Sequence, residues 1–179
     1  MSGTKIISAA AVGLGTLLYA STSHAAPDDR DLILVPMEGG YMHNFGAYRG
    51  RPNQSLGTLG SGFGYMWDRV GFMAIARVGM GPGGTRLGWG GGRGYYSLLG
   101  NDLFELGPDL SITAGGGKVD GKRGGLIAAA EPGISARAYS EMAGMFELKA
   151  NWYQPLSNDQ SWGSGAMLSL SWHPIYTIW

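Results

Sequence analysis

The chain has 179 residues, of which 44% are hydrophobic and 11% aromatic, and it carries 33 glycines and 13 acidic against 13 basic residues. A net charge of zero gives no basic surface for nucleic acid, and the lack of cysteine excludes disulfides, thiolate metal sites and a cysteine nucleophile. The hydrophobic content argues against disorder, so the glycines belong to folded structure, where they are typical of tight curvature and close backbone approach.

Residues 1–25 have the pattern of a secretory signal peptide. Lys5 supplies the positive n-region, an apolar stretch follows, and Ser23-His24-Ala25 places small residues at the two critical positions of a cleavage site. A transmembrane helix is the alternative, but the apolar stretch is short and rich in small residues. We therefore expect residues 1–25 to be removed and residues 26–179 to form one exported domain.

The remaining chain divides into eight segments in which apolar and polar residues tend to alternate. In the clearest one, Phe146, Leu148 and Trp152 share one face, while Glu147 and Lys149 lie on the other. Outer-membrane barrel strands alternate lipid-facing and lumen-facing residues in this way. The predicted strands run approximately over 32–46, 54–67, 70–81, 86–99, 102–116, 123–139, 142–155 and 162–179.

The connections between these segments alternate between short and long. Tight turns are predicted at 68–69, 100–101 and 140–141, and longer loops at 47–53, 82–85, 117–122 and 156–161. Short periplasmic turns and longer external loops are the known asymmetry of outer-membrane barrels, and an even strand number places both termini in the periplasm. We predict an all-β fold: an eight-stranded antiparallel up-and-down transmembrane β-barrel, located in a bacterial outer membrane.

Aromatic residues cluster near the segment ends, as in the girdles at membrane interfaces. The predicted periplasmic girdle contains Trp67, Tyr95, Tyr96, Phe104, Tyr139, Tyr176 and Trp179. The predicted outer girdle contains Tyr41, Trp89, Trp152 and Trp162.

The last segment ends on an aromatic residue, Trp179. With the strand pattern, this residue makes the mature chain resemble the small eight-stranded outer-membrane barrels of the OmpA and OmpX type. That resemblance implies outer-membrane lipids, lipopolysaccharide and the outer-membrane assembly machinery as partners. The register of the last strand stays open: counting back by two from Trp179 reaches His173, whereas the other register is more apolar but contains Pro174. A bulge near His173-Pro174 would reconcile the two.

Eight charged residues fall on the inward side of the predicted strands. An eight-stranded barrel is just wide enough to be filled by side chains, so charges inside it must be paired. We expect them to form a structural salt-bridge plug, with a proton or ion path as the alternative. The predicted interior polar network comprises Glu38, Arg77, Glu105, Asp109, Glu131, Arg137, Glu147 and Lys149.

Four prolines lie in the interior of predicted strands, where they cannot donate to the hydrogen-bond ladder. Pro108 and Pro132, in strands five and six, are expected nearly opposite each other, and Pro36 and Pro174 lie in the two strands that close the barrel. Lost backbone bonds are costly in lipid. The two weakened seams resemble those of the outer-membrane palmitoyltransferase, which admit lipid sideways, and this resemblance implies a candidate lateral lipid gate. The alternative is that these prolines lie at bulges or strand ends.

His43 is a candidate site at the outer rim, close to Tyr41 and to the loop that contains Ser55. A histidine can activate a serine hydroxyl, but neither the His-x-Ser pattern of lipid A deacylases nor the residue set of the palmitoyltransferase is found. We predict a rim hydrogen bond for His43, no catalytic residue, no metal and no cofactor.

The predicted function is that of an integral outer-membrane protein with a plugged, charged lumen and a structural or envelope role. The alternative is a barrel that binds lipid or another apolar ligand. As an enzyme, such a barrel would be a lipid A acyl hydrolase or acyltransferase.

Overall fold

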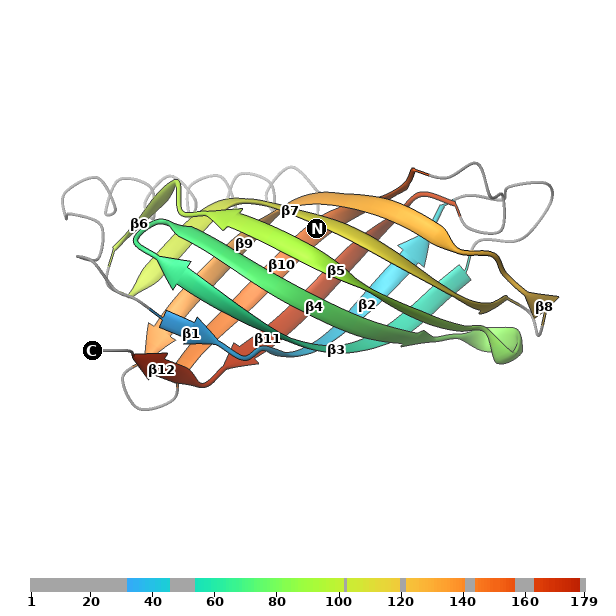
Figure 1. Ribbon diagram of the computed structural model, residues 1–179, viewed down its shortest axis with the longest axis horizontal. Helices are drawn as coiled ribbons and strands as arrows, with labels where there is room; N and C mark the ends of the chain where they lie inside the picture. The colour runs from blue at the N-terminus through green and yellow to red at the C-terminus, as the bar shows by residue number, and fades with distance from the viewer. Residues whose placement is uncertain are drawn as a thin grey trace, which may run out of the picture.

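The computed structural model describes residues 32–45, 54–101, 103–119, 122–140, 144–156 and 163–177, so the predicted signal peptide lies outside the described residues. These residues form a closed barrel of eight antiparallel strands, shown from the side in Figure 1, and the predicted fold is confirmed. Four barrel strands are continuous: β3 (Gln54–Trp67), β4 (Val70–Met80), β7 (Phe104–Val119) and β10 (Gly144–Pro155). No helix among the described residues is long and apolar enough to cross a membrane.

The other four barrel strands are each divided into two pieces. They are β1 (Leu32–Leu34) with β2 (Met37–Asn44), β5 (Arg86–Tyr96) with β6 (Leu99–Asn101), β8 (Lys122–Arg123) with β9 (Ile127–Ser140), and β11 (Gly165–His173) with β12 (Ile175–Thr177). A short 3-10 turn, η2 (Pro82–Gly84), joins β4 to β5. The end of the barrel that carries η2 and β8 is called the outer end here, and the end that carries the C-terminus is called the inner end (Figure 1).

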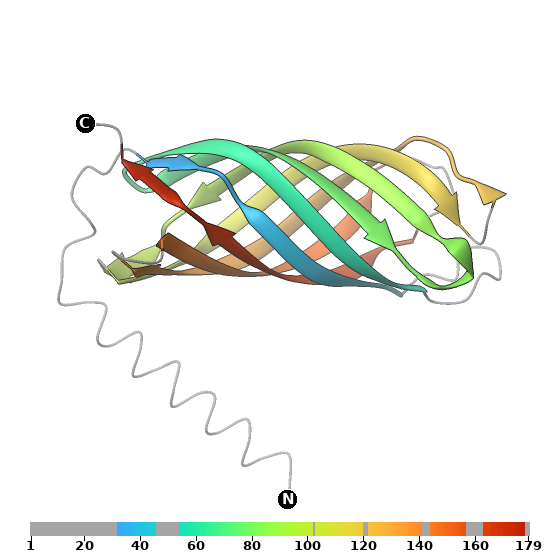
Figure 2. The same ribbon diagram turned by 90° about the horizontal axis from the view of Figure 1, so that it is seen from below.

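The barrel closes between its first and last strands. β2 pairs with β11 as far as Met37 opposite Trp172, and β1 pairs with β12 from Leu34 opposite Ile175. Figure 2 shows these two interrupted strands crossing the near side of the barrel together. Both strands advance by three positions across the interruption, so the register is unbroken and no bulge lies at His173-Pro174.

The side chains of β11 decide between the two registers left open by the sequence. Leu168, Leu170 and Trp172 are exposed on the outer wall, whereas Ser171 and His173 are buried inside. The more apolar register therefore faces outward as far as Trp172.

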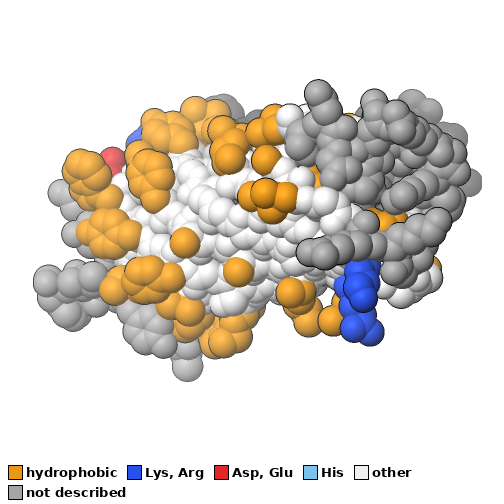
Figure 3. All heavy atoms as spheres, turned by 45° about the vertical axis from the view of Figure 1, so that its right-hand side comes forward, with side chains coloured by type: hydrophobic (Ala, Val, Ile, Leu, Met, Phe, Trp, Pro, Cys, Tyr) orange, Lys and Arg blue, Asp and Glu red, His pale blue; other side chains and the backbone are white. Residues whose placement is uncertain are grey.

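The sidedness of the strands is the reverse of that in a water-soluble protein. On β10, Glu147 and Lys149 are buried inside the barrel, while Phe146, Leu148 and Trp152 are 42%, 50% and 43% exposed. Figure 3 shows hydrophobic side chains distributed over the outer wall. Large apolar side chains on the outside and charged ones inside are the pattern expected when lipid, not water, surrounds the strands.

Strand β5 departs from this pattern because its outward positions are glycines. Gly88, Gly90, Gly92 and Gly94 occupy outward positions, and the inward positions between and beside them are Leu87, Trp89, Gly91, Arg93 and Tyr95. Two of those inward side chains, Trp89 and Tyr95, are 5% and 4% exposed. Their predicted places in the aromatic girdles are therefore wrong: both rings fill the lumen.

A bulge lies where β5 gives way to β6. Tyr95 is opposite Asp109, and Leu99 is opposite Leu106. From Tyr95 to Leu99 the barrel strand made of β5 and β6 advances by four residues, while β7 advances by three. One extra residue therefore lies beside Pro108.

Candidate functional site: the interior polar network

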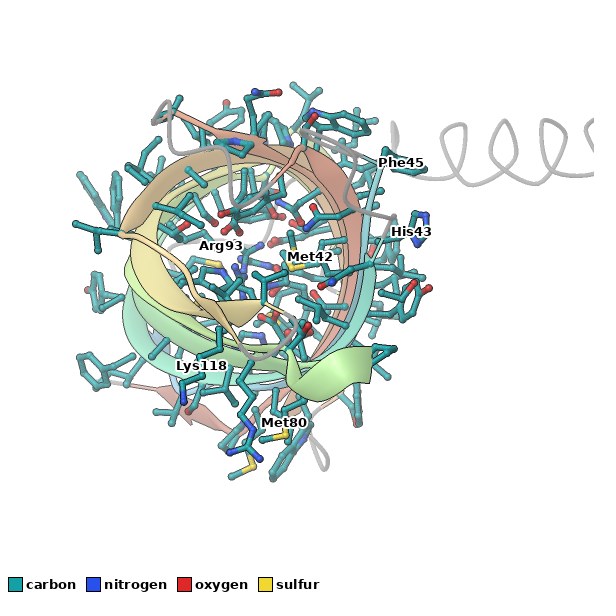
Figure 4. All side chains as sticks on the ribbon, turned by 90° about the vertical axis from the view of Figure 1, so that its right-hand side faces the viewer. Met42, His43, Phe45, Met80, Arg93 and Lys118 are labelled. Carbon is teal, nitrogen blue, oxygen red and sulfur yellow. The ribbon has the colours of Figure 1, made fainter. Side chains whose placement is uncertain are left out.

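The lumen is filled in three layers. Apolar side chains occupy the outer end, comprising Met42, Leu56, Leu87, Trp89, Val119, Ile127, Ala129, Tyr153 and Met167. A second apolar group occupies the inner end, comprising Leu32, Leu34, Met66, Met73, Ile75, Tyr95 and Met145. Charged and polar side chains lie between these two groups, and Figure 4 shows Met42 and Arg93 pointing into the lumen from the wall.

The first half of the polar layer is built around Arg77 from β4. Its Nε donates to Glu38 on β2 at 2.8 Å, and its Nη1 donates to Glu131 on β9. Lys149 on β10 donates to the other carboxylate oxygen of Glu38. Trp89 donates its indole N–H to Glu131 at 3.1 Å, which gives the ring a polar partner inside the barrel.

The second half of the polar layer is built around Glu147 on β10. Arg93 from β5 donates to both of its carboxylate oxygens, at 2.8 and 2.7 Å, and Arg137 donates through Nε at 2.8 Å. His173 Nε2 lies 3.3 Å from the same carboxylate. Arg93 also donates to Asp109 on β7 at 2.7 Å, so one guanidinium joins three strands.

The structure places all eight predicted network residues inside the barrel, each no more than 7% exposed. Glu105 is connected to the network through Tyr95, from which it accepts a hydrogen bond at 3.0 Å. The Arg137 guanidinium lies over the same tyrosine ring, 3.3 Å from its centre. Hydrogen bonds from charged donors to ionised acceptors are the strong kind, and paired charges avoid the cost of isolated burial. The arrangement can therefore hold distant strands together without a water-filled lumen.

The sequence-based set omitted Arg93 and His173. Both lie on the inward parity of their strands, at alternate positions from Tyr95 and from Ser171. With Arg93 included, the buried charges comprise five acids and four bases, which nearly balance. Arg93 shares its parity with Trp89 and Tyr95, and the glycines between them give no contrast that would assign this face to the lumen.

The prolines of the candidate gate lie at two seams. Pro108 and Pro132 are both exposed on the outer wall and offset by two positions, since Pro108 is opposite Ile134 and Leu110 is opposite Pro132. The β7–β9 pairing continues through them from Phe104 to Gly115. Each of these two prolines interrupts the pairing with the strand on its other side, β5–β6 for Pro108 and β10 for Pro132. Backbone pairing is also interrupted at the closing seam, around Pro36 and Pro174.

His43 lies on the outer wall near the outer end, where Figure 4 shows it with Phe45 pointing away from the lumen. Its Nδ1 is 2.9 Å from Ser55 Oγ, and Tyr41 donates its hydroxyl to the same oxygen at 2.6 Å. Among the described residues, no acid is hydrogen-bonded to His43, and no three His, Cys, Asp or Glu side chains are grouped to hold a metal ion. The structure thus places the His43 imidazole next to the Ser55 hydroxyl, but among the described residues it shows no acid that would orient the imidazole.

These features define the class of the fold: an eight-stranded barrel of the outer-membrane type. No family model and no curated protein matches the sequence. Among solved structures, the chain is similar to the crystal structure of Neisserial surface protein A, with a TM-score of 0.55 and 9% sequence identity, covering 83% of this chain and 97% of that one. At this identity the similarity concerns the fold alone.

Proposed function

We propose that this protein is an integral outer-membrane barrel with a sealed lumen and a structural role in the cell envelope. The observation that carries the proposal is the span of the polar layer. Arg77 joins β4 to β2 and β9, and Arg93 joins β5 to β7 and β10, so side chains cross the lumen in several directions. Apolar layers lie on both sides of this network. To cross the lumen, an ion would have to lose its hydration in each apolar layer and break the ion pairs between them.

The proposed membrane location is supported by the exposed apolar wall and by the fold. Under this proposal the outward side chains contact outer-membrane lipids and lipopolysaccharide, and the assembly machinery inserts the exported chain. The leader 1–25 would supply the export step. No enzymatic activity is part of this proposal.

The experiment is a conductance measurement on purified protein in planar lipid bilayers. We expect no discrete current steps from the wild-type protein, whereas a known porin in the same bilayers gives steps and shows that the assay is sensitive. A reproducible step from the wild-type protein would contradict the sealed lumen. Unheated and heated portions of the same sample must migrate at different positions on a gel, which shows that the silent protein was folded.

The alternative function, binding of an apolar ligand admitted through the wall, is favoured by one observation: the interrupted pairing at the closing seam. A photoactivatable phospholipid provides the test. Sideways entry predicts cross-links to inward residues near that seam, such as Leu34 and Met145, and cross-links confined to outward residues such as Leu170 would reject it. Mass spectrometry of lipid A from cells with and without the protein tests the enzymatic form of this alternative.

A further inference from the structure

We propose that the outer wall holds one phosphorylated lipid of the outer leaflet, with the phosphate between Arg86 and Lys118 and one acyl chain in the groove over β5. This inference rests on the membrane location of the proposed function but not on the sealed lumen. It assigns a ligand site to a part of the wall that the interior network does not use.

The groove exists because β5 has no outward side chains between its two ends. Its outward residues Gly88, Gly90, Gly92 and Gly94 are flanked at the middle by Ala76 on β4 and Ala114 on β7, which are also small. The space over the inner half of β5 measures about 1110 Å³, and its walls include Phe63, Phe72, Tyr96, Pro108 and Leu110. A second, separate hollow of about 630 Å³ lies toward the outer end of the same strand, over Gly88 and Gly116.

The length of the glycine row matches one leaflet of a bilayer. Gly88 and Gly94 are six positions apart, which is roughly 20 Å along a strand at about 3.3 Å per residue. With a strand tilt of about 40°, this corresponds to a depth of roughly 15 Å, half of the ~30 Å hydrocarbon core. Counted from Arg86, the strand reaches Gly94 after eight positions, roughly 26 Å of strand or roughly 20 Å of depth. A lipid chain that begins at the headgroup level near Arg86 therefore has glycine positions beneath it through the full depth of one leaflet.

The outer end of the groove carries two cations at the same level. Arg86 and Lys118 are directly opposite each other on β5 and β7, and both are exposed on the outer wall. Figure 3 shows basic side chains at one edge of the apolar surface, and Figure 4 shows Lys118 and Met80 outside the barrel ribbon. Like charges on directly opposite residues destabilise a sheet, so the pair favours an anion between them.

The chemistry of the anion follows from these surroundings. No acidic residue lines the outer hollow in the described part of the chain, so the two cations have no competing carboxylate there. An arginine guanidinium can bind a phosphate through two parallel hydrogen bonds, and a lysine contributes a point charge. Because the apolar residues Val78 and Met80 line the same hollow as this pair, the site fits an anion that is attached to an acyl chain.

Four variants test the proposal. Arg86→Gln/Lys118→Gln removes the two charges from exposed positions, and Gly92→Leu fills the groove at a site where an added Cβ meets nothing within 4 Å. Matched controls are Arg69→Gln, a cation at the inner end, and Gly39→Leu, an equally open outward glycine on β2. All variants must retain the heat-dependent mobility of the wild-type barrel.

Binding is measured by native mass spectrometry with lipid A as the probe, in its phosphorylated form and with the phosphates removed. At about 1 kcal/mol per basic residue, we expect Arg86→Gln/Lys118→Gln to weaken binding of the phosphorylated form about thirtyfold and to leave the dephosphorylated form unchanged. Gly92→Leu should weaken binding of both forms, and both controls should match the wild type. Equal binding of phosphorylated lipid A by the wild type and by the double glutamine variant would overturn the proposal, as would equal wild-type binding of the two lipid forms. A channel in the wild-type protein would refute the sealed lumen and leave this result unaffected.

Discussion

Replacing Arg93 by methionine should strongly destabilise the barrel. The Arg93 guanidinium makes two hydrogen bonds to Glu147 and one to Asp109, at 2.7 to 2.8 Å. Methionine keeps much of the side-chain volume but removes all three donors and the charge. Glu147 would retain Arg137 and His173, whereas Asp109 would lose its ion pair and keep the hydrogen bond from Asn151.

The expected loss is about 3–5 kcal/mol in the free energy of unfolding, the usual cost of removing one partner from a buried ion pair. Most of this cost comes from the carboxylate left uncompensated at Asp109. Adding Asp109→Asn to Arg93→Met removes that charge, so the double variant should recover roughly 1–3 kcal/mol. Arg69→Met, at a partly exposed turn, serves as the control and should change stability by less than about 0.5 kcal/mol.

The assay is urea unfolding of protein in lipid vesicles, followed by the ratio of folded to unfolded bands on a cold gel. The reasoning would be refuted if Arg93→Met unfolded at the same urea concentration as the wild type. It would also be refuted if Asp109→Asn further destabilised the Arg93→Met variant, because the uncompensated charge would then not be the cause.

Three further predictions concern the wall. Gly91→Ala should destabilise by about 1–3 kcal/mol, because its Cβ would lie 2.0 Å from a backbone oxygen of β7, whereas Gly92→Ala should be tolerated; equal urea midpoints for the two would contradict this. Amides flanking Pro36 and Pro174 should exchange with deuterium at least about tenfold faster than those at the centre of the continuous β3–β4 pairing, and uniform exchange around the barrel would count against a weakened seam. His43→Ala should cost less than about 1 kcal/mol and leave the lipid A composition of cells unchanged in mass spectra, and the disappearance of a lipid A species would instead assign His43 a catalytic role.

The strands were predictable because lipid and lumen demand opposite side chains at neighbouring positions. On β10 the charged residues Glu147 and Lys149 alternate with Phe146 and Leu148, and that contrast alone assigns the two faces. On β5 the contrast is missing: glycine occupies the lipid side, so Trp89 and Arg93 gave no sign of their direction. Arg93 was therefore left out of the predicted network.

The partners inside the lumen could not be predicted from the sequence for a different reason. Arg77 meets Glu38 and Glu131 from strands 39 and 54 residues away, and the pairing depends on strand tilt across a closed barrel. Which side chains contact each other across the lumen depends on the register of every strand, and short glycine-rich strands specify their register weakly.

The central claim is that hydrocarbon surrounds the outward side chains while protein fills the lumen, and two tryptophans test it directly. Variants that retain either Trp152, 43% exposed on the outer wall, or Trp89, 5% exposed inside, are placed in vesicles of brominated phospholipid. The account predicts strong fluorescence quenching of Trp152 by the brominated chains and little quenching of Trp89. Quenching of both, or of Trp89 alone, would contradict it.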